Sequence, residues 1–451
     1  MRHSLALCLA IPLITAAVAC GTADPGQTAG TVEITVMGRP LVADVAGRKW
    51  FDDKVAAFEA ANPGIKIKPS DATWDARSFA ARLAGGNVET VIRVPLTEPA
   101  ALIARTQVAD ITTEAKALPS WASFDPKVLE PVTKDGKVYG VPENMYALGV
   151  VYNRELFTKA GLDPDRPPTT WDGLRAAAKQ IKDRTGAIGF GAMTTKNAGG
   201  WHLTAQTYSY GGTMERVEAG QAVASFADGP AEQVLNLLKQ MRWTDDSMGT
   251  QQLRSQDDMN KDYAAAKVAM QINAPDYYAA YVQNFGGDPA KFGMAALPQG
   301  GGNTTLVGGT IDMISAKATP QQRAAAVKWI DYIYLKVISD PAAAVEYNKS
   351  RAADNLPVGV PVLPLFTQDT QDKVNAAIAS YVNVPTKNFK PFLEGTKNLR
   401  YGPEPAVAAQ ELYGVLDATV QAVLTKPDAD VHALLSEASD RVNAILKQKQ
   451  Q

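Results

Sequence analysis

The sequence predicts an α/β protein whose folded body divides into two lobes. Strands alternate with amphipathic helices along the chain, which is typical of lobes with mostly parallel sheets. The folded body would contain about 420 residues, too many for one hydrophobic core and suited to two lobes of roughly 200 residues each. Hydrophobic residues make up 46% of the chain and charged residues 20%, the balance of a soluble globular protein.

The first βαβ unit is predicted close to the start of the folded body. Residues 31–37 alternate as a strand, and residues 49–61 carry apolar side chains at helical spacing. Asn62-Pro63-Gly64 ends this helix before a second strand at 65–69. Further strands are predicted at 90–94 and 149–153, and further helices at 97–105, 154–160, 171–184, 320–335 and 406–424.

Three tryptophans lie on these predicted helices at apolar spacing. We expect Trp50, Trp171 and Trp329 to belong to the hydrophobic core. Thr170 directly precedes the helix at 171–184 and is expected to cap it. Asp172 would lie in its first turn, where the helix dipole favours an acidic side chain.

The N-terminus has the features of a signal for export. Arg2 and His3 precede an apolar run from Leu5 to Val18, which is too short to span a bilayer comfortably. The run ends in Ala17-Val18-Ala19-Cys20, which resembles the lipobox where a bacterial lipoprotein is cleaved and acylated on cysteine. We therefore expect a signal peptide at 1–19 and a lipid on Cys20 that tethers an extracytoplasmic protein to the cell membrane.

Cysteine usage favours the lipid over an ordinary cleavage that leaves a free thiol. Cys8 lies in the predicted signal, so the mature chain keeps only Cys20 and cannot form an internal disulfide. Residues 20–30 are rich in small and polar residues, as expected of a flexible linker. No later apolar stretch is long enough to span a membrane, so the lipid would be the only membrane attachment.

The net charge gives no reason to expect nucleic acid as a partner. One of the 45 basic residues, Arg2, lies in the predicted signal, whereas all 47 acidic residues lie beyond it. A slightly acidic chain has no electrostatic attraction to phosphate backbones.

Several stretches of the mature chain resemble one family. The most specific are 136–142 (GKVYGVP), 151–157 (VYNRELF), 160–162 (AGL) and 167–171 (PPTTW), in this order. Supporting stretches are 58–65 (FEAANPGI), 266–270 (AKVAM), 292–298 (FGMAALP) and 308–309 (GG). With them the sequence resembles an extracellular solute-binding protein of family 1, the lipoprotein component of sugar-importing ABC transporters.

This resemblance implies a periplasmic-binding-protein-like fold, with discontinuous lobes joined by crossover strands and a ligand enclosed in the interlobe cleft. We expect the first lobe at 31–145 and 306–350, and the second lobe at 146–305 and 351–451. The run Gln299-Gly300-Gly301-Gly302-Asn303 lies near the second expected crossover. It would be either a hinge or an ordinary surface turn.

A sugar site needs a flat apolar surface for the C–H face of the ring and fixed planar groups for its hydroxyls. Trp201 follows a glycine-rich approach, where the resemblance implies a stacking aromatic; burial in the core is the alternative. Two clusters are expected near the cleft: Asp276, Tyr277 and Tyr278 after the helix-breaking Pro275, and Glu143, Asn144 and Tyr146 on the first crossover.

Other candidates rest on position alone. Arg39 lies at the tip of the first strand and Glu98 at the end of the third, while Tyr401 lies in a polar loop. Gly309 and Thr310 would present backbone amides to hydroxyls, unless the glycines only admit a tight strand crossing.

Neither a metal site nor a cofactor is expected. The mature chain has only two histidines, His202 and His432, far apart in sequence, and its single cysteine would carry the lipid. The sequence has no Gly-x-Ser-x-Gly elbow, no His-Glu-x-x-His and no phosphate loop.

The sequence therefore favours a non-enzymatic, monomeric binding component that closes around a small ligand and is then recognised by a membrane permease. The ligand would be a mono- or oligosaccharide, with another polyol or a glycerophosphodiester as alternatives. An extracytoplasmic glycosidase, which needs only two suitably spaced carboxylates, is the first alternative. A polysaccharide-binding lipoprotein with an open, flat surface is the second.

Overall fold

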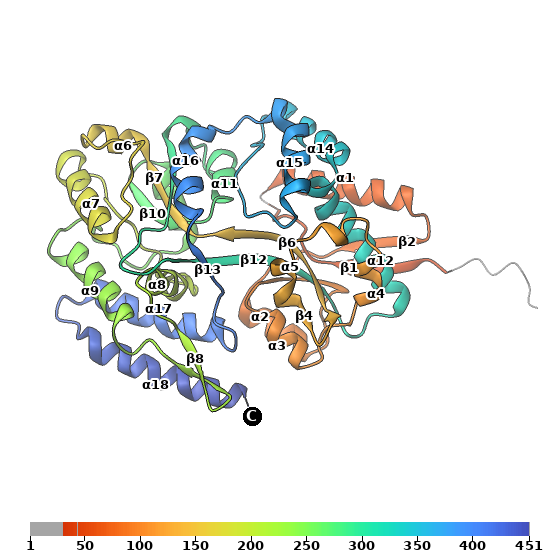
Figure 1. Ribbon diagram of the computed structural model, residues 1–451, viewed down its shortest axis with the longest axis horizontal. Helices are drawn as coiled ribbons and strands as arrows, with labels where there is room; N and C mark the ends of the chain where they lie inside the picture. Colours follow the sequence, from red (N-terminus) through yellow and green to blue (C-terminus); the bar gives the residue numbers. More distant parts are fainter. Residues whose placement is uncertain (1–29, 43, 451) are drawn as a thin grey trace, which may run out of the picture.

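The computed structural model describes residues 30–42 and 44–450. The expected signal peptide, the lipid site at Cys20 and all of the linker except residue 30 lie outside the described residues. Two lobes lie side by side, joined by β6 (Gly140–Ala147) and β12 (Thr304–Ile314), which run from one lobe into the other (Figure 1). The two-lobed α/β architecture predicted from the sequence is thus confirmed.

The larger sheet forms the first lobe and reaches into the second along β12. Its order is β13-β12-β3-β1-β2, and β6 also pairs with β12. β1 is parallel to β2 and β3, whereas β12 is antiparallel to β3 and β6. The remaining strands of this sheet are β1 (Val32–Val36), β2 (Ile65–Pro69), β3 (Val91–Pro95) and β13 (Arg400–Gly402). The carboxyl ends of β1 and β3 therefore meet at one edge, where Arg39 and Glu98 follow them.

The sheet of the second lobe departs from the expectation of mostly parallel strands. β7 (Gly149–Asn153) lies between β10 (Met270–Asn273) and β11 (Phe292–Ala296), and both pairings are antiparallel. All residues of these strands except the last residue of β11 are buried. β7 and β11 are mostly apolar, as in parallel strands covered on both faces, whereas β10 alternates apolar and polar residues. Two hairpins complete the strands: β4 (Thr133–Lys134) with β5 (Lys137–Val138), and β8 (Glu215–Glu218) with β9 (Gln221–Ala224).

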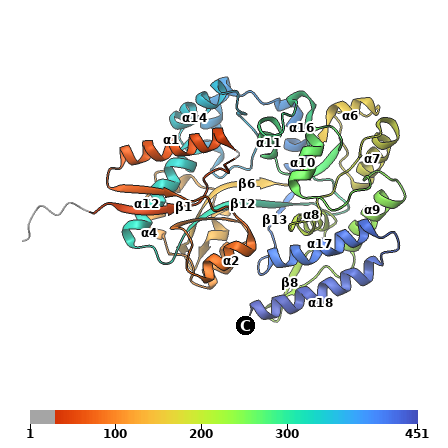
Figure 2. The same ribbon diagram turned by 180° about the vertical axis from the view of Figure 1, so that it is seen from behind.

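Helices surround both sheets (Figures 1 and 2). Those of the first lobe, to which α15 is assigned by the packing argued below, are α1 (Val45–Ala61), α2 (Ala76–Ala84), α3 (Pro99–Ala104), α4 (Thr112–Lys116), α5 (Pro126–Leu129), α12 (Pro320–Ile330), α13 (Lys336–Ser339), α14 (Pro341–Ala353) and α15 (Gln368–Ile378). Those of the second are α6 (Arg154–Lys159), α7 (Trp171–Thr185), α8 (Ala198–Ser209), α9 (Pro230–Trp243), α10 (Gln256–Ala264), α11 (Tyr277–Gln283), α16 (Thr386–Thr396), α17 (Ala409–Thr425) and α18 (Val431–Lys449).

Local chemistry sets the helix ends as the sequence predicts. The Thr170 hydroxyl accepts a hydrogen bond of 3.1 Å from the Gly173 amide, which caps α7. At the other end of α7, Gly186 has a positive φ of 75°, a conformation that glycine adopts without steric cost. The predicted helix at 320–335 continues beyond α12 as a π-helix over Asp331–Leu335.

Two of the three tryptophans assigned to the core are buried. Trp329 packs edge-on against Phe51 and Phe58, with ring centroids 5.6 and 5.3 Å apart, in the first-lobe core. Trp171 is buried in the second-lobe core. Trp50 is only half-buried: it packs against the edge of the same core and also lines a cavity, so the core prediction holds for it only in part.

The packing of α15 bears on where the lobes divide. Its Val374 and Ile378 lie in one apolar cluster with Ala344 of α14, although residues from 351 onward are expected in the second lobe. Helix α16, by contrast, packs against β11 of the second lobe. We therefore propose that the final crossing into the second lobe lies between α15 and α16, because α14 and α15 share an apolar contact that excludes water.

Candidate functional site

The crossover strands bring several predicted residues together. Across β6 and β12, Tyr146 faces Gly308 and Asn144 faces Thr310. A Cβ atom on Gly308 would lie 2.6 Å from the Tyr146 hydroxyl, and one on Gly309 would lie 2.5 Å from the Asn144 carbonyl oxygen. These glycines are therefore required for close strand crossing, the second of the two roles considered from the sequence.

Two cavities meet at Tyr146. The first-lobe cavity has a volume of about 610 Å³, and the crossover cavity, which has walls from both lobes, has a volume of about 260 Å³. Tyr146, Trp74 and Pro95 line both. The remaining lining of the crossover cavity comes from the second lobe and consists of Lys196, Asn197, Ala198, Trp201, Gln256, Asn273, Ala274, Asp276, Glu404, Gln410 and Tyr413.

Trp201 lies in the crossover cavity, where the sequence places the stacking aromatic. Its ring is half-buried and stands at 87° to that of Tyr146, with 6.3 Å between the ring centroids. Its indole nitrogen is buried without a partner in hydrogen-bond geometry, although it is near enough to the Glu404 carboxyl to lower the pKa of that group. Two nearly perpendicular aromatic rings and the Trp201 indole N–H, which lies close to the Glu404 carboxyl, therefore meet in one small space.

The position of Trp201 follows from how α8 begins. The Asp417 carboxylate of α17 accepts hydrogen bonds from the amides of Asn197 (2.7 Å) and Gly200 (2.9 Å), which caps α8 from a neighbouring helix. A Cβ atom on Gly200 would lie 2.3 Å from the Tyr413 carbonyl oxygen. The glycine-rich approach therefore allows α8 and α17 to pack closely while Trp201 points into the cavity.

Two carboxyl groups face the crossover cavity. Asp276 is exposed at the cavity, although desolvation by the surrounding protein raises the pKa of its carboxyl group. Burial raises the pKa of Glu404 to about 8, with a further increase from the Glu98 charge and an opposing hydrogen bond of 3.3 Å from the Tyr413 hydroxyl. Both groups also raise the pKa of Tyr146, although its burial is the main cause.

The first-lobe cavity contains charges that are already paired. The Arg93 guanidinium binds the Glu143 carboxylate in a bidentate pair and lies over the Tyr334 ring, 5.7 Å from its centroid. This pairing outweighs desolvation and raises the pKa of Arg93. Glu143, Gly309 and Thr310, all predicted site residues, line this cavity.

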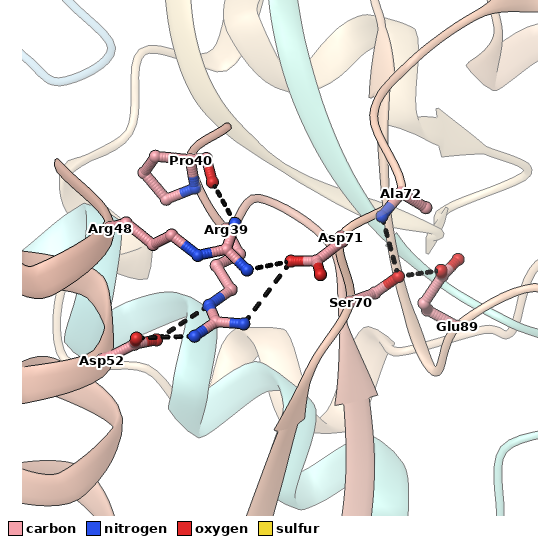
Figure 3. Close-up of polar contacts among 8 residues, drawn as sticks. All are labelled: Arg39, Pro40, Arg48, Asp52, Ser70, Asp71, Ala72 and Glu89. Carbon is pink, nitrogen blue, oxygen red and sulfur yellow. Dashed lines mark hydrogen bonds and ion pairs between the residues drawn. The ribbon is translucent and has the colours of Figure 1, made fainter. Parts of the chain in front are cut away.

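Arg39 also lines the first-lobe cavity, as part of a charge network (Figure 3). It donates to Asp52 at 2.9 and 2.6 Å and approaches Asp71 at 3.5 Å. Arg48 binds the same Asp71 at 2.5 Å. The Asp52 hydrogen bond is the main cause of the raised pKa of Arg39. The guanidinium is therefore neutralised locally before any ligand arrives.

Asp312 lies beneath these paired charges and was not identified from the sequence. It is fully buried on β12, and neither carboxyl oxygen has a hydrogen-bond partner among the described residues. Desolvation, with a smaller contribution from Glu143, raises its pKa well above the usual range. The Arg93 charge opposes this shift, so it is the burial of Asp312 that favours its neutral form.

Glu98 lies at an outer edge cavity of about 500 Å³ between α2 and α3 of the first lobe and α17 and α18 of the second. Both views place the C-terminal end of α18 near α2 (Figures 1 and 2). Here the Thr97 hydroxyl accepts a hydrogen bond of 3.3 Å from the Gln410 amide and donates one of 3.2 Å to Glu98. Glu98 does not line the crossover cavity, although its charge acts on Glu404.

Four predicted site residues are not brought to these cavities. Tyr277 and Tyr278 are buried in an aromatic cluster with Tyr281 and Phe292, because α11 turns them toward the sheet and leaves Asp276 at the cavity. Asn144 donates to Glu143 at 3.3 Å and lines none of the three cavities. Tyr401 is exposed on β13 and lines a separate hollow beside the β8–β9 hairpin.

Several cavity residues escaped the sequence analysis, among them Trp74, Arg93, Glu404 and Tyr413. Glu404 lies only three residues after Tyr401, in the polar loop that the sequence predicts near the site. Nothing in the local pattern distinguishes Trp74 or Arg93, because their positions depend on the approach of the other lobe and on the pairing with Glu143.

Neither a metal site nor a membrane span is found in the part of the chain that the structure describes. No group of three or more His, Cys, Asp or Glu side chains there could hold a metal ion. No helix there combines the length and apolar character needed to cross a bilayer.

Comparison with known proteins identifies a family and supports the two-lobed fold. Residues 43–337 match the family described as bacterial extracellular solute-binding protein. The chain is similar to a binding protein of Brucella abortus, with 25% identity over 429 residues that cover 91% of this chain and 93% of that one.

Two solved structures share the fold. The solute-binding protein of an ABC transporter from Thermotoga lettingae, bound to α-D-tagatose, has 19% identity and a TM-score of 0.72, over 92% of this chain and 100% of that one. UgpB from Mycobacterium tuberculosis, in complex with glycerophosphocholine, has 16% identity and a TM-score of 0.71, over 94% of this chain and 100% of that one.

Proposed function

The chain belongs to the bacterial extracellular solute-binding protein family, and on that basis we propose that it captures a carbohydrate between its lobes and delivers it to the permease of an ABC importer. The observation that carries this proposal is the crossover cavity, where Trp201 and Tyr146 offer perpendicular aromatic faces beside Asp276 and Glu404. Aromatic faces suit the C–H side of a sugar ring, and carboxyl groups suit its hydroxyls.

The extent of the cleft favours a ligand of more than one ring or an extended polyol. The first-lobe cavity and the crossover cavity share Tyr146, Trp74 and Pro95, and the edge cavity shares Trp74 with both. The relatives of known structure are described with ligands of different sizes, a tagatose and a glycerophosphocholine. Their ligands suggest what to test rather than which ligand binds here.

A thermal-shift screen tests the proposal directly. The purified mature chain would be melted with monosaccharides, oligosaccharides, polyols and glycerophosphodiesters. A ligand present at 100 times its Kd should stabilise the folded state by about 2.7 kcal/mol, because it binds only that state. If no member of these classes raises the melting temperature, the proposed carbohydrate function is wrong.

We also propose that the protein is anchored by a lipid on Cys20 and acts as a monomer. The support is the lipobox-like Ala17-Val18-Ala19-Cys20 run and the single cysteine of the mature chain. Cys20→Ser should move the protein from the membrane fraction to the medium. Retention of this variant in the membrane would contradict the lipid anchor, and a dimer mass in solution scattering would contradict the monomer.

The protein is further proposed to bind its ligand without chemical change. The family is one of transport binding proteins, but Asp276 and Glu404 in one cavity are the kind of pair that a glycosidase needs. Prolonged incubation with a bound oligosaccharide should return it intact, as chromatography of the mixture would show. Release of shorter products, abolished by Glu404→Gln, would instead support the glycosidase.

A further inference from the structure

The carboxyl groups of the crossover cavity have no basic partner among the described residues. Neither Asp276 nor Glu404 has a basic nitrogen of Lys, Arg or His within 4.0 Å there. Lys196 lines the same cavity but is exposed and forms no ion pair with either group. The cavity therefore holds two carboxyl groups that have no basic partner in the described part of the protein. Desolvation favours their neutral form when the cavity is empty, and a cation beside them would favour the ionised form.

The basic groups of the facing lobe do not supply this compensation. Arg93 is bound bidentately by Glu143, and Arg39 is bound by Asp52 and approached by Asp71. Each guanidinium is therefore committed within its own lobe. An anionic ligand would have to break one of these pairs. A cationic ligand would instead meet two carboxyl groups without a basic partner, and its charge would favour their ionised form.

Aromatic rings surround the same space. Trp74, Tyr146, Trp201 and Tyr413 line the crossover cavity, and the perpendicular arrangement of Tyr146 and Trp201 presents one ring face and one ring edge to each other. A cation placed over an aromatic face is attracted by the negative face of the ring, and more strongly where water is excluded. Aromatic faces together with carboxyl groups that have no basic partner are the combination that recognises an ammonium group.

We propose that the crossover cavity selects a hydroxylated ligand carrying a positively charged nitrogen, such as an amino sugar or a choline-bearing polyol. This inference rests on the proposed function, since it assumes that the ligand lies between the lobes. The ammonium would lie among Tyr146, Trp201 and the two carboxylates. The hydroxyl groups would extend toward the first-lobe cavity, which shares Tyr146 and Trp74 with the crossover cavity.

Two matched ligand pairs test the charge requirement by calorimetric titration of the mature chain. The first pair is the β-1,4-linked glucosamine disaccharide and cellobiose, which share a skeleton but carry an ammonium or a hydroxyl at C2. The second is choline and its uncharged carbon isostere. We expect the charged member of at least one pair to bind about 10-fold more tightly. The pair that shows the preference distinguishes an amino sugar from a quaternary ammonium ligand.

Isosteric variants test whether the two carboxyl groups cause the preference. Asp276→Asn and Glu404→Gln should each reduce the ratio of charged-ligand to neutral-ligand affinity several-fold, because each substitution removes the ionisable group and keeps the shape of the side chain. Asp183→Asn is the matched control, because Asp183 is an exposed carboxylate of α7 in the same lobe, paired with Lys179. The control should leave the ratio unchanged, and circular dichroism would verify that all three variants fold.

The outcomes separate this inference from the proposed function. Equal or tighter binding of the uncharged member of both pairs overturns the charge requirement and leaves carbohydrate capture intact. A charge preference that survives in the Asp276→Asn, Glu404→Gln double variant also overturns the assignment to these residues. If neither these ligands nor any neutral sugar or polyol binds, both proposals fail.

Discussion

On the first-lobe wall of the cleft, Arg93 and Arg39 each hold a carboxylate of their own lobe, whereas on the second-lobe wall Asp276 and Glu404 have no basic partner among the described residues. The first wall is thus electrostatically complete without a ligand, and the second is not. Desolvation raises the pKa of both second-wall carboxyls. A ligand's charge and hydrogen-bond donors would therefore matter most at the second wall.

The largest expected effect concerns Glu404 and pH. Its pKa is raised to about 8 in the folded protein, whereas the unfolded chain releases this proton near its ordinary pKa of about 4.3. Between these two pH values the folded state keeps a proton that the unfolded state has lost. The contribution of Glu404 to the free energy of unfolding is therefore highest below about pH 4.3 and decreases as pH rises through about 8. The shift corresponds to about 3 to 5 kcal/mol.

Glu404→Gln should remove this pH dependence. Urea unfolding of the ligand-free protein at acidic and alkaline pH would show a smaller loss of stability in the variant than in the wild type. Glu218→Gln, at an exposed carboxyl of β8 paired with Arg216, should behave like the wild type. An unchanged pH profile in Glu404→Gln would contradict the raised pKa of Glu404, and with it the difference between the two walls.

The next effect is on ligand affinity and concerns the aromatic part of the second wall. Trp201→Ala should weaken ligand binding by about 2 to 4 kcal/mol, roughly 30-fold to 1000-fold, because it removes a stacking face. Because the Trp201 ring is only half-buried, its removal should cost less folding stability than the removal of a core tryptophan. Calorimetric titration and thermal melting of the same preparation measure both quantities.

Trp171→Ala provides the contrast to Trp201→Ala. The Trp171 ring is fully enclosed, and its indole nitrogen donates to the Ser209 hydroxyl at 2.8 Å. Its removal should cost about 3 to 5 kcal/mol of folding stability. If Trp201→Ala instead loses as much stability as Trp171→Ala and keeps its ligand affinity, Trp201 is a core residue and the site is misplaced.

On the first wall, loss of one partner should destabilise the folded protein. Glu143→Gln would leave the Arg93 guanidinium with a neutral partner in a partly buried position, at a cost of about 1 to 3 kcal/mol. Asp312→Asn provides a contrast to Glu143→Gln, because the buried Asp312 carboxyl has no hydrogen-bond partner among the described residues to lose. It should be neutral or stabilising in urea unfolding. A large destabilisation by Asp312→Asn would show that Asp312 is charged.

The smallest effect is expected at the rim of the first wall. The Asp52 side chain is 42% exposed, so Asp52→Asn should cost at most about 1 kcal/mol of stability. Asp53→Asn, which breaks an exposed pair with Lys49 within α1, should cost about 0.3 to 0.5 kcal/mol. If chemical denaturation gives the same loss of unfolding free energy for Asp52→Asn and Asp53→Asn, the Arg39 network stabilises the first wall no more than an ordinary surface pair does.

Local patterns gave most of the fold correctly. β1, β2 and β7 and the capped start of α7 lie at or within a residue of their predicted positions, because alternation, helical periodicity and side-chain caps are set by neighbours in the chain. The antiparallel second-lobe sheet was missed because a fully buried strand has the same apolar pattern in either orientation.

The sequence by itself determined the family resemblance, the α/β alternation, the expected export signal and a stacking candidate at Trp201. Tertiary structure alone decided that Asp276 faces the cavity while Tyr277 and Tyr278 are buried, that Glu404 joins it, and that Arg39 and Arg93 are already paired. The physical reason is that a periodic pattern reports the environment of a residue within its own element. Whether a charge is compensated depends on elements far apart in the sequence, such as β3 and β6, or α8, α11 and α17, that only folding brings together.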